Sequence, residues 1–83
     1  MRVLYFAWVK EKAGIAAEEI DPPAEVATIA ELIDWLKARG PQFENAFARS
    51  EVIRAAIDQS HVRHDARIKG AREIAFFPPV TGG

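Results

Sequence analysis

The 83-residue chain carries 11 Lys and Arg against 12 Asp and Glu, and its composition, 49% apolar and 28% charged, is that of one small globular domain. A net charge of −1 excludes the strong positive field of a nucleic-acid-binding protein, and no apolar run reaches the roughly 18 residues of a membrane-spanning helix. The chain has no cysteine, which excludes disulfides, Cys-ligated zinc and a thiol or persulfide chemistry of its own. The apolar stretch after Arg2 is cut short by charges and lacks a cleavage site, so we expect a cytoplasmic protein.

The first predicted element is a strand within residues 1–11, where apolar positions alternate with the others. The even-numbered positions begin and end with charged residues, so this face is expected to point outward and the odd-numbered side chains are expected in the core. The even face nevertheless carries three large apolar groups: Leu4, Phe6 and Trp8. Such a patch indicates a partner-binding surface, unless a loop or a second layer covers it. Gly14 permits a turn, and residues 18–21 are predicted as the antiparallel return strand.

The central predicted element is a helix that begins at a capping box from Thr28 to Glu31, whose side chains satisfy free backbone N–H groups. Its apolar stripe has helical spacing: Ile29, Leu32, Ile33 and Leu36. Residues 40–41, Gly-Pro, are expected to end it. Phe43 and Phe47, four residues apart, predict a short second helix that closes one end of the core.

Three further strands are predicted, over residues 53–58, 61–63 and 72–77. The order of elements predicts an α+β roll, with a mixed sheet of four to five strands and the main helix packed across one face. If the last strand lies beside the first, the two are parallel because a helix separates them in sequence. Phe77 then falls on the same outward face as the even-numbered apolar residues near the N-terminus.

Six residues follow the last strand: Pro78, Pro79, Val80, Thr81, Gly82 and Gly83. The two prolines end strand pairing and favour an extended chain, and six extended residues reach about 20 Å. Because glycine has no Cβ, Gly82 and Gly83 allow a partner's backbone and a nucleotide to approach the terminal carboxylate. We therefore divide the chain into a domain over residues 1–77 and an extended tail over residues 78–83.

A self-contained active site is not visible in the sequence. His61 and His64 lie near Asp65, but a metal site needs three or four ligands and no other His or Cys exists, so no metal is expected. Ser-His-Asp arrangements, glycine-rich phosphate loops and paired carboxylates are missing. Basic residues at 63–72 alternate with acids and form either a solvated face or a contact with an acidic groove of a partner. Any chemistry is therefore assigned to the C-terminus.

The whole chain resembles the small, sulfur-carrying subunits of molybdopterin synthase, a family with the ubiquitin-like β-grasp fold. The most specific match is the run over residues 75–83, Ala-Phe-Phe-Pro-Pro-Val-Thr-Gly-Gly, and residues 3–7 and 55–59 support it. The resemblance implies that Gly83 is adenylated by a ubiquitin-activating-like adenylyltransferase with ATP and is thiocarboxylated by a separate sulfur donor. It also implies that the large synthase subunit receives the tail in its active site, within a heterotetramer. Sulfur then passes to cyclic pyranopterin monophosphate in molybdenum cofactor biosynthesis, and this chain binds no cofactor itself.

The resemblance further implies a docking surface at three positions: Phe6, His61 and Phe77. Leu4 and Trp8 join them from the alternation of the first strand. His61 departs from the family pattern, in which an aliphatic residue is usual at this position. Asp58 stands where the family often has Asn, which we interpret as a variation in a turn.

Three alternatives share parts of this interpretation. The chain is a sulfur carrier for thiamin or tRNA thiolation, a ubiquitin-like protein modifier joined to lysine through Gly83, or a β-grasp interaction module with an inert tail. The Phe-Phe-Pro-Pro run favours the molybdopterin carrier over the other carriers.

Overall fold

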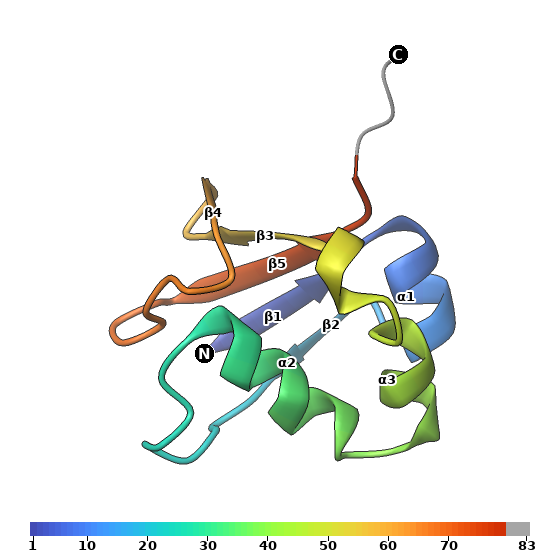
Figure 1. Ribbon diagram of the computed structural model, residues 1–83, viewed down its shortest axis with the longest axis horizontal. Helices are drawn as coiled ribbons and strands as arrows, with labels where there is room; N and C mark the ends of the chain where they lie inside the picture. Colours follow the sequence, from blue (N-terminus) through green and yellow to red (C-terminus); the bar gives the residue numbers. More distant parts are fainter. Residues whose placement is uncertain (80–83) are drawn as a thin grey trace.

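The structure, a computed structural model, describes residues 1–79 and contains one mixed sheet with helices packed on it (Figure 1). The strands are β1 (Arg2–Tyr5), β2 (Ala17–Glu19), β3 (Arg54–Ile57), β4 (Ser60–Val62) and β5 (Glu73–Phe77). The helices are α1 (Ala7–Ala13), α2 (Ile29–Lys37) and α3 (Pro41–Ala46), with a 3-10 turn, η1 (Ser50–Val52). In the part of the chain that the structure describes, none of the helices has the length and apolar character needed to span a bilayer.

The sheet has the strand order β2-β1-β5-β3-β4. β1 and β5 are parallel neighbours, and the other three pairs are antiparallel. The last strand therefore lies beside the first in the middle of the sheet, and the two are parallel, as the sequence predicts for strands in this arrangement. This arrangement confirms the expected α+β roll and the β-grasp topology.

The main helix confirms the sequence prediction in detail. Thr28 Oγ1 accepts a hydrogen bond from the Glu31 N–H at 3.2 Å, and Glu31 Oε1 accepts one from the Thr28 N–H at 3.1 Å. All four residues of the apolar stripe on α2 are buried. They share one core with the inward side chains of β1 and β5: Val3, Tyr5, Ile74 and Phe76. α2 ends at Lys37, before the predicted Gly-Pro stop, and Pro41 instead begins α3.

The strand predicted within residues 1–11 is wrong beyond Tyr5, because α1 begins at Ala7. Val9 and Ala13 are buried on α1 and lie four residues apart. A spacing of four residues returns to the same face in a helix and also in a strand, so the burial of Val9 fits either structure. The helix closes at Gly14, whose φ of 83° is left-handed and whose N–H donates to the Lys10 carbonyl at 2.9 Å. Residues 1–79 thus contain one more α-helix than the sequence predicts.

The turn between β3 and β4 consists of Asp58 and Gln59, with φ values of 47° and 73°. Two adjacent positive φ angles are typical of a tight two-residue hairpin loop, in which Asp is tolerated. The Asp58 Oδ1 atom also accepts hydrogen bonds from the N–H groups of Arg72, at 3.0 Å, and Glu73, at 2.9 Å. The hairpin is therefore fixed to the start of β5, which confirms the turn role expected for Asp58.

A polar network joins β1, β2 and the segment after α2. The Tyr5 hydroxyl donates to Glu18 Oε2 at 2.7 Å, and the Arg39 guanidinium binds both carboxylate oxygens of Glu18, at 2.7 and 2.8 Å. The hydrogen bond from Arg39 is the main cause of the lowered pKa of Glu18. Burial, with the Glu18 hydrogen bond next, raises the pKa of Tyr5. The network thus stabilises the ionised carboxylate in the folded state.

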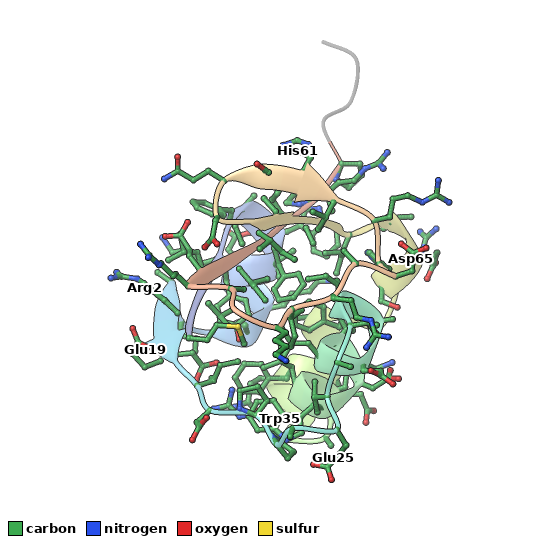
Figure 2. The ribbon with its side chains drawn as sticks, turned by 90° about the vertical axis from the view of Figure 1, so that its left-hand side faces the viewer. Arg2, Glu19, Glu25, Trp35, His61 and Asp65 are labelled. Carbon is green, nitrogen blue, oxygen red and sulfur yellow. The ribbon has the colours of Figure 1, made fainter. Side chains whose placement is uncertain are left out.

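Because the pKa of Glu18 is lowered on folding, its charged form contributes stability above the pKa of an unfolded Glu, about 4.3, and the contribution is lost as pH falls through the lower folded value. We expect Glu18→Gln to reduce the free energy of unfolding by about 1 kcal/mol at pH 7, and by progressively less below pH ~4. Urea unfolding at each pH measures the difference. Glu25, which points into solvent in Figure 2, provides the matched control Glu25→Gln. A pH-independent difference for Glu18→Gln would contradict the prediction.

Candidate functional site

The face of the sheet opposite α2 carries a row of small and apolar side chains. The cross-strand registers align five positions across all five strands: Ala17, Leu4, Ala75, Ala56 and His61. Ala56 and Ala75 are only 5% and 9% exposed, yet neither belongs to the core cluster beneath the sheet. The middle of this face is therefore a shallow apolar strip.

Two aromatic side chains lie next to this strip, at the carboxyl end of β5. Phe6 is 47% exposed, and its N–H donates to the Phe76 carbonyl at 3.1 Å, which holds it beside β5. Phe77 is half-buried, whereas its neighbour Phe76 is fully buried on the core side. The Phe77 and His61 rings lie 5.1 Å apart at 51°. This confirms the predicted outward orientation of Phe77.

The strip and the aromatic side chains form one continuous region, which we call the outer apolar surface: Leu4, Phe6, Ala17, Ala56, His61, Ala75 and Phe77. Four of the five residues predicted from the sequence belong to it. Of its members, Phe6 and His61 are exposed, and the others are half-buried or buried between them. Apolar residues that gather around exposed aromatic side chains on one face are typical of a protein-binding surface. The three alanines could not be found from the sequence because an isolated Ala gives no signal of the face on which it lies, and only the strand register brings them together.

Trp8 does not belong to this surface, so its predicted placement is wrong. The strand stops at Tyr5, and Trp8 therefore lies on α1, where it is half-buried against the core. The Lys12 ammonium lies 5.1 Å from the centroid of its ring, a cation–π contact within one helix. Trp8 thus packs α1 and does not extend the outer apolar surface.

β5 ends at Phe77, at the edge of the outer apolar surface, and Pro78 and Pro79 continue the chain without strand pairing. Proline cannot donate a backbone hydrogen bond, so the pair stops the ladder here. The other predicted tail residues lie outside the described residues: Val80, Thr81, Gly82 and Gly83. The described part of the tail is therefore its base, which starts beside the exposed aromatic side chains.

The two histidines have separate surroundings. The His64 Nε2–H donates to the Ile53 carbonyl at 2.8 Å and so links the segment after β4 to the segment before β3. His61 is exposed on the outer face (Figure 2). Within residues 1–79, no three His, Asp or Glu side chains are grouped to bind a metal ion.

Comparisons with known proteins agree with this fold. The model of the ThiS family matches residues 3–83. The molybdopterin synthase sulfur carrier subunit of Escherichia coli strain K12 is 35% identical over 83 residues, covering 100% of this chain and 99% of that protein. The Dictyostelium discoideum protein of the same name is 38% identical over 84 residues, covering 99% of this chain and 94% of its own. Among solved structures, SAMP1 from Haloferax volcanii superposes with a TM-score of 0.75 at 25% identity, covering 100% of this chain and 98% of that one. The chain therefore belongs to the ThiS family, as a relative of the molybdopterin synthase sulfur carrier subunits.

Proposed function

We propose that this chain is the sulfur carrier subunit of a molybdopterin synthase and that its reactive group is the C-terminal carboxylate of Gly83. The observation that supports this most is the full-length similarity to sulfur carrier subunits, which extends over the terminal Gly-Gly. The missing cysteine is consistent with it, because the sulfur must then be carried by a group other than a side-chain thiol. We expect the cycle to take place in the cytoplasm.

The chemistry requires activation of the carboxylate, which is a poor electrophile. A carboxylate oxygen of Gly83 attacks the α-phosphorus of ATP on an adenylyltransferase and releases pyrophosphate. Hydrosulfide supplied by a separate donor then attacks the acyl carbon, displaces AMP and loses its proton. The resulting thiocarboxylate holds nucleophilic sulfur at the end of the tail. In the active site of the large subunit this sulfur displaces an oxygen substituent of cyclic pyranopterin monophosphate, and water then cleaves the acyl–sulfur bond, which leaves the sulfur on the pterin and regenerates the Gly83 carboxylate.

The outer apolar surface is the proposed docking site for the large subunit. Its aromatic side chains, Phe6 and Phe77, lie where the chain leaves the sheet, so docking there directs residues 78–83 into the partner. Large aromatic side chains at the centre of an interface commonly contribute most of the binding energy. Two prolines limit the conformations of the tail and so reduce the entropy lost when it enters a narrow channel.

A second candidate is a protein modifier, in which the activated Gly83 forms an isopeptide bond with a lysine. The likeness to SAMP1, a small archaeal modifier protein by name, favours it. A third, a carrier for thiamin or tRNA thiolation, differs only in the acceptor of the sulfur.

One experiment separates these candidates. The tagged chain is incubated with ATP, its adenylyltransferase and cell extract, and bound proteins are analysed before and after denaturation. The carrier function predicts noncovalent capture of the large subunit, released by denaturant. Adducts that survive denaturant would support the modifier and contradict the carrier. Adding cyclic pyranopterin monophosphate to the captured complex should yield molybdopterin, which neither thiolation alternative predicts.

A further inference from the structure

Two arginines lie at the tail end of the outer apolar surface. The β3–β5 register places Arg54 directly opposite Phe77. In the β3–β4 register, Ala55 pairs with Val62, the last residue of β4. Arg54 precedes Ala55 and Arg63 follows Val62, so the two arginines lie at the same end of this strand pair. Both arginines are exposed, and both line the same surface hollow beside Val62. By the alternation of side chains along each strand, they lie on the same outer face of the sheet as Phe77 and His61, and they therefore border these two aromatic side chains.

These two charges are not compensated by the residues around them. Within residues 1–79, no carboxylate lies within ion-pair distance of Arg54 or Arg63. The one acid that lines the hollow, Glu51, pairs with Arg49 at 3.5 Å. Positive charge is therefore concentrated at the point where β5 ends.

The opposite end of the same face is arranged differently. There the registers place Arg2 between Glu19 and Glu73, so its cross-strand neighbours on both sides are acidic. Figure 2 shows Arg2 and Glu19 near one another and far from His61. The net charge of the whole chain is −1, so the positive end reflects local placement and not overall composition.

We propose that Arg54 and Arg63 form a cationic rim that binds carboxylates of the partner subunit around the pocket that receives Phe77. The inference rests on the proposed function, because the partner is the large synthase subunit. A guanidinium binds a carboxylate through two parallel hydrogen bonds, and charges at the rim of an apolar contact accelerate association and exclude partners with the wrong charge. A protein is favoured over a nucleic acid because only two cations border an apolar surface on an acidic chain. The rim thus specifies a partner whose docking pocket is bordered by Asp or Glu.

The test measures the Kd and association rate of the chain with its purified large subunit over a range of NaCl concentrations. Arg54→Gln/Arg63→Gln is expected to weaken binding about tenfold at low salt, chiefly through slower association, and the difference should vanish at high salt. The matched control Arg2→Gln/Lys69→Gln removes the same amount of charge at positions away from the tail. Its Kd and association rate should stay close to those of the unsubstituted chain. Arg54→Glu/Arg63→Glu should invert the salt dependence, so that binding strengthens as salt is added.

The outcomes are distinguishable. Equal Kd values and salt slopes for the unsubstituted chain and Arg54→Gln/Arg63→Gln would overturn this inference and leave the carrier function standing. Failure of the unsubstituted chain to bind the large subunit would overturn the proposed function and this inference with it. If the unsubstituted chain binds a single-stranded oligonucleotide and both arginine variants do not, the rim is a nucleic-acid site, and this result also overturns the proposal. Because both side chains are exposed, thermal unfolding of the variants should match that of the unsubstituted chain.

Discussion

Deletion of Gly83 is expected to abolish sulfur transfer while the domain stays folded and still binds the large subunit. The deletion removes no described core residue, because the last one along the chain is Phe76. It moves the reactive carboxylate to Gly82 and shortens the tail by roughly 3.5 Å. A displacement of about 1 Å at a reacting group can already cost about a hundredfold in rate, so a loss greater than a hundredfold is expected. The measurement is the rate of molybdopterin formation in the reconstituted synthase.

Gly83→Ala is the matched control for this deletion. It keeps the carboxylate at its distance from the domain and adds only a methyl group, so it should retain more activity than the deletion. Undiminished molybdopterin formation by the chain that lacks Gly83 would remove the terminal carboxylate from the mechanism.

Substitution of the two adjacent phenylalanines should separate binding from folding. Phe77→Ala is expected to weaken binding of the large subunit by about 2 kcal/mol, roughly thirtyfold in Kd, as for a central aromatic of an interface. Its melting temperature should change little, because Phe77 lies half-exposed on the outer face. Calorimetric titration with the large subunit measures the Kd, and thermal and urea unfolding of each variant measure the stability.

Phe76→Ala, one residue earlier, should have the reverse profile. The Phe76 ring is fully buried and packs on Phe47, at 5.1 Å between ring centroids, and on Tyr5, at 6.4 Å. Its truncation should cost about 3–5 kcal/mol of unfolding free energy, a large part of the stability of a small domain. A large loss of stability in Phe77→Ala would place its ring in the core, and an unchanged Kd would exclude it from docking.

Local signals account for what the sequence predicts correctly. The capping box and the stripe on α2 depend on residues within one helix, so no tertiary information is needed to recognise them. The outward orientation of Phe77 follows from alternation within β5. The parallel direction of β1 and β5 follows from the intervening helix once the two strands are neighbours, but their pairing itself does not follow from the sequence.

Features that depend on the register or on competing periods could not be predicted. Alternating apolar residues near the N-terminus predict a strand where α1 lies, because the burial of Val9 fits the period of a strand as well as that of a helix. The position of Arg54 beside Phe77 depends on the pairing of strands that lie far apart along the chain. The network of Tyr5, Glu18 and Arg39 likewise joins three segments with no common motif. Each of these needed the three-dimensional arrangement.

Gly83 is proposed to carry sulfur as a thiocarboxylate. The most direct test is the intact mass of the chain after incubation with ATP, the adenylyltransferase and a sulfide source. The mass should increase by the exchange of one oxygen for one sulfur, the change should be localised by fragmentation to the C-terminal residue, and it should be absent without ATP. An unchanged mass under conditions in which ATP is cleaved to AMP, or sulfur found on any other residue, would contradict it.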